Sequence, residues 1–199
     1  QLFDIKSLSY MCKGMVDRIA SSGSILTHQK HKRKPVMLKV QARDHQQAIR
    51  YILDILIKPG WGVIKSYRQI SGIGHRVVHG AEAFTKPTII NEKVLDTLKK
   101  FTGLAPLHNP PALLSIEACR KFIKNIPQVA VFDTAFHQTI APEAYIYGIP
   151  YEYYKDLRIR RYGFHGTSHK FVAKEAAKRL KRGLGRLKLI TCHLGNGCS

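Results

Sequence analysis

Acidic residues are scarce in this chain. Its 199 residues include 13 Asp and Glu against 33 Lys and Arg, which gives a formal net charge of +20. Two basic clusters, residues 28–34 and 178–188, supply much of the excess. Such a charge suits a nucleic-acid partner, because neutralised phosphates drive that binding, but no nucleic-acid-binding motif is present. We therefore predict a solvated basic surface without a nucleic-acid partner, whose field attracts small anions.

Cysteine pairs and long apolar runs are also lacking. The four cysteines form no CxxC pair and no zinc pattern, which favours reduced thiols in a cytoplasmic protein. The apolar runs fall far short of the about 20 residues that a membrane-spanning helix requires. We therefore expect neither a disulfide-stabilised fold nor a membrane span.

What is present is an alternation of strand and helix patterns, typical of the α/β class. Residues 36–40 alternate apolar and polar side chains, as a half-buried strand does. Residues 43–58 carry a broad apolar face and end at Pro59-Gly60, which predicts a helix. The other expected elements are strands at 1–5, 70–78, 129–133 and 187–191, an exposed hairpin tip at 28–35, helices at 91–101 and 111–123, and a helix after residue 168 that buries Phe171, Val172, Ala176 and Leu180.

Two expected strands deliver a charged side chain near their carboxyl ends, where open α/β sheets bind their ligands. Asp133 follows the apolar run 129–132, and Arg76 lies near the end of the strand at 70–78. A guanidinium offers a planar fork of donors that matches a carboxylate or a phosphate. From the residues alone, a surface ion pair is the favoured interpretation for Arg76, and a turn cap through Thr134 stays open for Asp133.

A glycine-flanked histidine, His165, precedes the last long helical pattern. Backbone N–H groups and the helix dipole both favour an anion there. His165 and His169 are also four residues apart, a spacing that binds zinc when both lie on one helix. Gly166 and the cap-like Thr167-Ser168 indicate that His165 lies before the helix, so we do not favour a metal.

Five blocks of sequence together resemble the acetokinase family. They are Gly-His-Arg-Val-Val-His-Gly (74–80), Ala-Pro-Leu-His-Asn-Pro-Pro (105–111), Val-Ala-Val-Phe-Asp-Thr-Ala-Phe-His (129–137), Arg-Tyr-Gly-Phe-His-Gly-Thr-Ser-His (161–169) and Thr-Cys-His-Leu-Gly-Asn-Gly-Cys-Ser (191–199). The blocks have the family's order and spacing. The resemblance implies an incomplete actin-like ATPase (ribonuclease H-like) fold, with most of the first domain at residues 1–134 and the start of a nucleotide-binding domain at 135–199.

The resemblance also implies a reaction, ATP + acetate ⇌ ADP + acetyl phosphate, by direct in-line transfer with Mg²⁺. A fragment without the family's first phosphate turn and C-terminal half is expected to show little turnover by itself, and the full-length enzyme is expected to be a homodimer. The implied roles are Arg76 for the substrate and the phosphoryl group, Val78 and Leu107 for the acetyl pocket, Asp133 for the metal and alignment, His108 and His165 for phosphoryl stabilisation, and His193, Gly195, Asn196 and Gly197 for ATP.

Several alternatives stay open at this point. His108 fits a loop hydrogen bond as well as a catalytic role, and Gly195-Asn196-Gly197 alone is usually just a turn. A propionate or butyrate kinase would share every block, and a basic non-catalytic binding module would explain the charge but not the blocks. One position also departs from the family, which usually has two glycines where this chain has Gly80-Ala81; a side chain there matters if φ is positive.

Overall fold

The computed structural model of the chain, which describes residues 1–199, divides into two units. Unit 1 comprises Gln1–Ile73 and Leu113–Pro127, and unit 2 comprises Gly74–Ala112 and Gln128–Ser199. This division reflects contacts within the chain, and the domain boundary expected after residue 134 stays a prediction.

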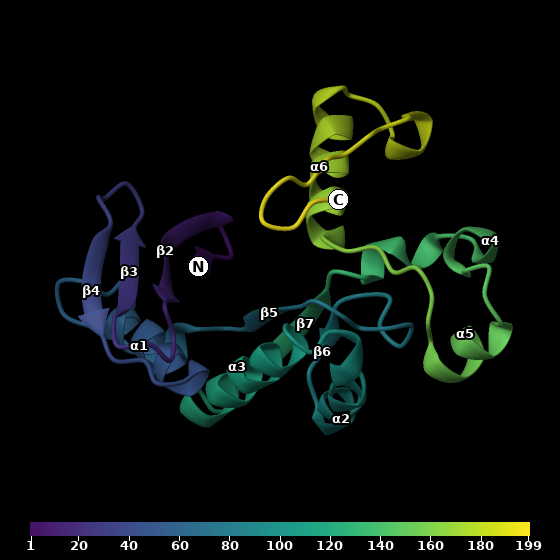
Figure 1. Ribbon diagram of the computed structural model, residues 1–199. Helices are drawn as coiled ribbons and strands as arrows, with labels where there is room; N and C mark the ends of the chain where they lie inside the picture. The colour runs from purple at the N-terminus through teal and green to yellow at the C-terminus, as the bar shows by residue number, and fades with distance from the viewer. The chain divides into compact units, whose positions relative to one another are not determined.

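Unit 1 begins with an antiparallel four-stranded sheet (Figure 1). Neighbouring strands in the sheet are also consecutive in the chain, so short hairpin turns suffice to connect them. The predicted strands at 1–5 and 36–40 are confirmed. The four strands are β1 (Leu2–Asp4), β2 (Ser9–Asp17), β3 (Ser24–Lys30) and β4 (Val36–Val40).

The expected exposed tip at 28–35 is wrong for its first residues. His28 lies inside β3, is 4% exposed, and its Nε2 is 2.9 Å from the carbonyl oxygen of Trp61. The side chains of Ser24, Leu26 and His28 are all buried, as the period of two in a strand requires. His28 was predicted to be exposed because histidine is a polar residue type. Its burial in the strand is possible because Trp61 supplies the hydrogen bond that a buried polar side chain needs.

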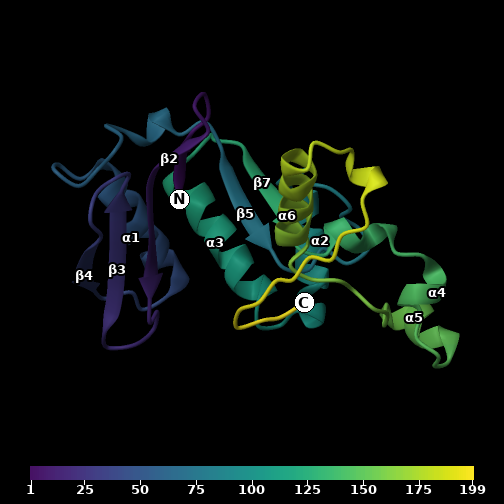
Figure 2. The same ribbon diagram turned by 90° about the horizontal axis from the view of Figure 1, so that it is seen from above.

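One helix, α1 (His45–Ile57), covers the sheet of unit 1 through contacts with β2 and β3 (Figure 2). Asp44 caps it by accepting a 2.7 Å hydrogen bond from the N–H of Gln47. The predicted helix at 43–58 is thus confirmed. Its apolar face joins a core with η1 (Tyr67–Gln69) and its flanks, made of Cys12, Leu53, Leu56, Ile70 and Ile123.

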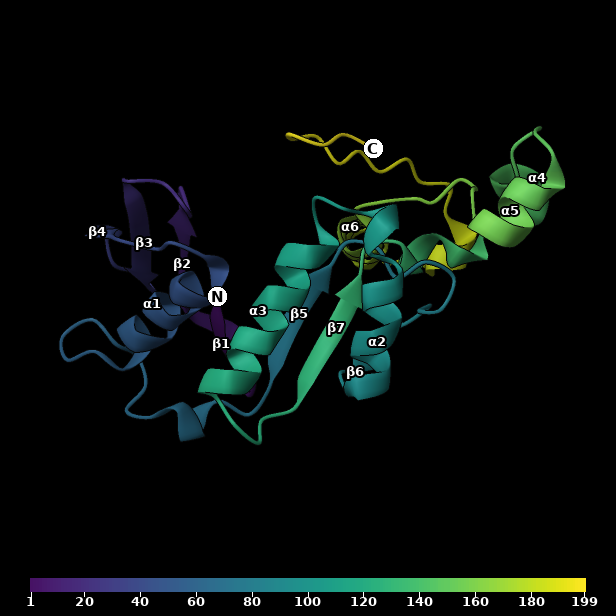
Figure 3. The ribbon, with the colours of Figure 1, turned by 60° about the horizontal axis from the view of Figure 1, so that its bottom comes forward.

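Unit 2 contains a second sheet, in the order β5-β7-β6, whose strands are β5 (Ile73–Val77), β7 (Gln128–Phe132) and β6 (Thr88–Ile89). The backbone N–H of Ile73 bonds to Pro127 at one end, and the N–H of Asp133 bonds to Val77 at the other. β5 and β7 therefore run parallel, as their arrows show in Figure 3. Parallel neighbours bring their carboxyl ends to one edge of the sheet, which puts residues after Val77 and Phe132 close together.

The helices after β5 agree with the predicted ones at 91–101 and 111–123. Asn91 caps α2 through the N–H of Val94, at 3.0 Å. No helix of the chain combines the length and the apolar character needed to cross a bilayer. The elements are α2 (Glu92–Lys100), η2 (Thr102–Leu104), α3 (Asn109–Phe122), η3 (Ala135–Thr139), α4 (Pro142–Tyr145), α5 (Tyr151–Leu157), α6 (Gly166–Arg179) and η4 (Leu184–Arg186).

Two predictions near the C-terminus are wrong. Residues 187–191 form no strand, and Ile190 is 95% exposed. The buried stripe of α6 consists of Gly166, His169, Ala173 and Ala177, not of Phe171, Val172, Ala176 and Leu180. Small residues and a hydrogen-bonded histidine face inward here, so a count of large apolar side chains selected the wrong face.

Candidate active site

An ion pair joins the carboxyl ends of β5 and β7. Arg76 Nη2 is 2.6 Å from Asp133 Oδ2, and Arg76 Nε lies 3.1 and 3.2 Å from the two carboxylate oxygens. The Asp133 side chain is 2% exposed and that of Arg76 is 63% exposed. Hydrogen bonding to Asp133 raises the pKa of Arg76, so this guanidinium stays charged. One side of the Arg76 guanidinium therefore pairs with the buried carboxylate, and the rest of it is exposed. Its Nη1 has no protein partner.

The space beside this pair is a pocket of about 920 Å³. Asp133 is its only acidic lining residue, so it suits an anion that meets Arg76. Seven predicted site residues come together here, whereas Val78, Leu107 and Gly195 are not part of the lining. The lining residues are Arg76, His108, Asp133, His165, Thr167, Ser168, Phe171, His193, Asn196 and Gly197.

The N-terminus of α6 brings His165 to the carboxyl edge of the sheet. The N–H of Gly166 donates a 2.9 Å hydrogen bond to the backbone oxygen of Asp133. A Cβ on Gly166 would lie 2.3 Å from that oxygen, so glycine permits this close approach. His165 itself adopts φ 51° and ψ 26°, the left-handed conformation that non-glycine residues adopt at a cost. This strained conformation is what puts the His165 imidazole in the pocket beside Asp133.

The segment 193–199 folds back over the same histidine. Its ends pair through backbone hydrogen bonds of 2.8 and 3.0 Å between His193 and Ser199. The rings of His193 and His165 stack with centroids 4.0 Å apart. Burial, and then the neighbouring His193, lowers the pKa of His165, so the neutral imidazole predominates at pH 7. A Cβ on Gly197 would lie 3.1 Å from the His165 ring. Only glycine at this position leaves that edge of the ring uncovered.

The residues expected for the acetyl group lie outside the pocket lining. Leu107 is 82% exposed, and Val78 is half-buried at the end of β5. His108 lines the pocket just before α3, and its imidazole has no hydrogen-bond partner in the chain.

Residues 1–199, the whole chain, match the model of the acetokinase family. The chain belongs to the acetokinase family. It is 49% identical over 199 residues to an acetate kinase of Desulfitobacterium hafniense and 51% identical to one of Caldicellulosiruptor saccharolyticus. The chain spans about half the length of these curated relatives, 50% of each.

Solved acetokinase structures have the same fold. The crystal structure of Porphyromonas gingivalis acetate kinase matches with a TM-score of 0.93 and 37% identity, over 100% of this chain and 50% of that one. A propionate kinase from Francisella tularensis matches with a TM-score of 0.89 and 36% identity, over 98% of this chain and 49% of that one. The predicted fold, an incomplete actin-like ATPase fold, is thereby confirmed.

Sequence reasoning missed the contribution of Phe171 to this acetokinase pocket. Its side chain is 65% exposed and lines the pocket with Thr167 and Ser168, instead of packing into the protein. The signal was available, because Phe171 lies four residues after Thr167 and therefore on the same helix face.

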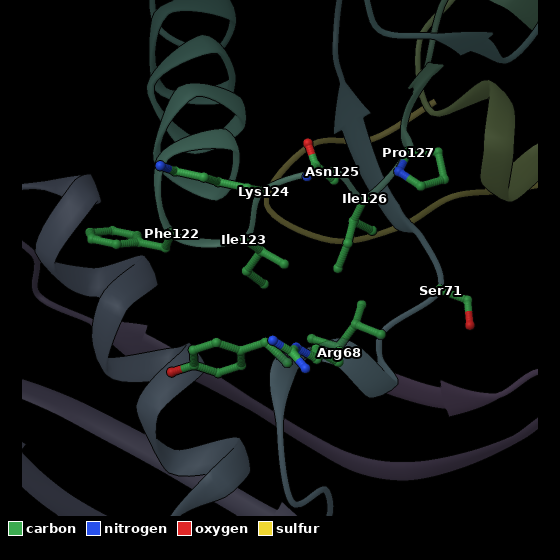
Figure 4. A pocket seen from close by; sticks show the side chains of 10 residues that line it. Arg68, Ser71, Phe122, Ile123, Lys124, Asn125, Ile126 and Pro127 are labelled. Carbon is green, nitrogen blue, oxygen red and sulfur yellow. The ribbon is translucent and has the colours of Figure 1, made fainter.

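A second pocket, of about 550 Å³, lies in unit 1 and contains none of the predicted site residues. Figure 4 shows Ile123 and Ile126, from the connection between α3 and β7, on one side and Arg68 on the other. Its lining residues are Tyr67, Arg68, Ile70, Ser71, Phe122, Ile123, Lys124, Asn125, Ile126 and Pro127. Arg68 has no side-chain partner, which makes it a useful control for Arg76.

Proposed function

We propose that the protein carrying this chain is an acetate kinase that transfers a phosphoryl group reversibly between ATP and acetate. The observation that carries this proposal is the buried Asp133 carboxylate paired with an accessible Arg76, in a pocket that also contains His108 and His165. Family membership and relatives that are named acetate kinase support the same reaction.

The chemistry needs position and positive charge more than proton transfer. Acetate is already ionised at pH 7, so Asp133 need not act as a general base. A phosphoryl group in flight carries negative charge on its equatorial oxygens. In the proposal, Arg76 neutralises this charge while Asp133 fixes the orientation of its guanidinium. Catalysis then depends on two things: the attacking and leaving oxygens are held in line with the phosphorus atom, and the hydrogen-bond donors are preorganised.

The two histidines act as donors in this proposal. His108 reaches the pocket without a competing hydrogen bond from the chain. His165, which is neutral and lies at the α6 N-terminus, donates one hydrogen bond to the transferred group and acts as the transition-state stabiliser. An uncharged donor lets the product anion leave more easily than a second fixed cation would.

Magnesium fits this site only in a limited way. No group of three His, Cys, Asp or Glu side chains in the chain could hold a metal. Asp133 accepts three hydrogen bonds from Arg76, which leaves about one of the four lone-pair positions of a carboxylate. Mg²⁺ is often bound through one carboxylate, waters and substrate phosphates. We therefore infer that Mg²⁺ is bound mainly by the nucleotide, with one oxygen from Asp133.

The remaining assignments rest on family membership. We propose that His193, Gly195, Asn196 and Gly197 contact ATP phosphates, since glycines let phosphates approach backbone N–H groups closely. Val78 and Leu107 are proposed to contact the acetyl methyl group. The domain boundary after residue 134, a homodimeric full-length enzyme and a cytoplasmic location belong to the same proposal.

The test is acetyl phosphate formation by the natural gene product that carries this chain, trapped as the hydroxamate. We expect turnover with ATP and acetate, and a lower kcat/KM with propionate. A higher kcat/KM with propionate would favour the second candidate, a propionate kinase, which the match to the Francisella tularensis enzyme supports. Absence of phosphoryl transfer to either acid would overturn both.

A further inference from the structure

Two histidines of α6 and its approach share one hydroxyl group. Ser199 Oγ lies 2.9 Å from His165 Nδ1 and 2.9 Å from His169 Nε2. The other nitrogen of His169, Nδ1, is 2.7 Å from Thr191 Oγ1. His169 is 7% exposed and lies one helical turn after His165. A continuous chain of hydrogen bonds therefore runs from Thr191 through His169 and Ser199 to His165.

A serine hydroxyl has one proton, which limits the possible arrangements. Burial lowers the pKa of both His165 and His169, so the form of each ring with a single proton predominates at pH 7. If His169 donates from Nε2 to Ser199, the Ser199 proton points to His165 Nδ1, and the proton of His165 is on Nε2. In the reverse arrangement, His165 donates from Nδ1 and its Nε2 has no proton.

The surroundings of Nε2 decide which arrangement is useful. No protein atom forms a hydrogen bond with His165 Nε2, and Gly197, which lies beside this nitrogen, has no side chain to cover it. A bare nitrogen lone pair there would repel an anion beside Arg76, whereas an N–H group would attract it. Stacking on His193 and the left-handed backbone fix the ring plane, so only the position of the proton remains to be set.

We propose that His169 and Ser199 are positioning residues that hold His165 in its Nε2–H tautomer, so that a donor faces the phosphoryl group. The role of the Nε2–H group toward a phosphoryl group rests on the proposed function, whereas the tautomer itself can be measured independently of that function. It also gives the His-Gly-Thr-Ser-His spacing a reason other than zinc, because the two rings share a hydroxyl group instead of a metal. Thr191 then donates to His169 Nδ1 and fixes the tautomer of His169, the first ring in this series of hydrogen bonds.

Long-range ¹H–¹⁵N correlation NMR of the natural gene product that carries this chain, at pH 7 and without nucleotide, measures the tautomer of each histidine directly. We expect His165 to show a protonated Nε2 and an unprotonated Nδ1. Ser199→Ala removes one exposed hydroxyl group and should give a mixture of His165 tautomers, and Ser199→Thr should restore the single form. Ser168→Ala is the matched control, because Ser168 Oγ is 3.0 Å from His193 Nδ1 and makes no bond to His165; it should leave His165 unchanged.

Two results would overturn the inference: a proton on Nδ1 of His165 in the wild type, or an unchanged tautomer in Ser199→Ala. His169→Gln tests the same chain one step earlier, and the serine variants decide the question if that variant does not fold. In the natural gene product, Ser199→Ala should lower kcat by roughly 10- to 100-fold with little change in KM, by analogy with the loss of groups that orient metal-bound imidazoles. A correct tautomer in a protein without phosphoryl transfer would refute the proposed function alone.

Discussion

At the scale of single residues, Ala81 is held in a conformation that suits glycine. Its φ is 46°, and it is 2% exposed. Its N–H donates to His79 Nδ1 at 3.0 Å, and its carbonyl accepts from Gln138 at 2.9 Å. These contacts fix the backbone after β5 and hold Ala81 in its left-handed conformation.

Ala81→Gly should therefore stabilise the protein. Relief of the left-handed alanine is worth about 1 kcal/mol, partly offset by the greater freedom of glycine in the unfolded chain. Urea unfolding measures the difference. The matched control is Ala130→Gly in the buried centre of β7, which should lose about 1 kcal/mol. Equal destabilisation by both changes would show that the positive φ carries no strain.

His79 couples stability to pH. Burial lowers its pKa to about 4, against about 6.5 in an unfolded chain. The unfolded state therefore binds more protons between these two values, so stability is complete above pH 6.5 and falls as the pH drops toward 4. This difference in pKa corresponds to a change of at most about 3 kcal/mol in the free energy of unfolding.

Replacement of this titrating group should flatten the profile. We expect His79→Gln to be less stable than wild type at pH 7.5, since it disturbs the bond to Ala81, but to lose less further stability at pH 4.5. Urea unfolding at the two pH values measures this. His75, His165 and His169 also have lowered pKa values, so part of the slope should persist. An identical slope in the variant would contradict the assignment.

At the scale of elements, one glycine docks α6 on the sheet. Gly166→Ala would bring a methyl carbon to 2.3 Å from the Asp133 backbone oxygen and 2.8 Å from Phe136, so the helix must shift. We expect a loss of about 2 kcal/mol or more, since backbone cannot move aside cheaply. Gly183→Ala is the control, because it has nothing within 4 Å. Thermal unfolding measures both, and a neutral Gly166→Ala would show that α6 is not docked through this contact.

A buried arginine holds the approach to α6. The Arg160 side chain is 4% exposed, its Nη1 is 2.6 Å from Glu82 Oε1, and its guanidinium carbon lies 3.4 Å from the centre of the Tyr145 ring. The next aromatic residue, Tyr162, has its ring 4.4 Å from that of His79. These contacts fix residues 160–162, and they explain how a stretch without regular structure delivers His165 to the sheet edge.

The elements that the sequence predicted well are those with one exposed face and clear end signals. The helix at 43–58 has a capping Asp44 and a terminal Pro59-Gly60, and the strand before Asp133 is a short apolar run. Residues 187–191 (Leu-Lys-Leu-Ile-Thr) are also largely apolar, but no neighbouring strand pairs with them. Pairing is a tertiary property, so a run of apolar residues alone could not decide it.

The residues of the candidate site were likewise predictable only where a local pattern marked them. Arg76 and Asp133 could be predicted because parallel strands share an edge, and His165 because glycines flank it before a helix. The network of Ser199, His169 and Thr191 could not, since it depends on a fold-back of residues 191–199 that no local pattern encodes.

At the scale of the whole molecule, the charge of +20 is a long-range property without a dedicated site. We expect only sequence-independent binding to duplex DNA at low salt, measured by fluorescence polarisation. Affinity should fall by about 10³-fold between 50 and 200 mM salt, as for proteins that make several phosphate contacts. The Arg76→Leu variant should behave like the wild type. Tight binding at 200 mM salt with preference for one sequence would support a nucleic-acid function instead.

The central claim is that Arg76 meets the migrating phosphoryl group. The most direct measurement compares kcat/KM for acetyl phosphate formation in Arg76→Leu and Arg68→Leu variants of the natural gene product, with circular dichroism to verify folding. Arg76→Leu should lower kcat/KM by about 10³-fold or more, the effect of an arginine on phosphoryl transfer, and Arg68→Leu should leave it at the wild-type value. A folded Arg76→Leu variant with wild-type kcat/KM would contradict the account.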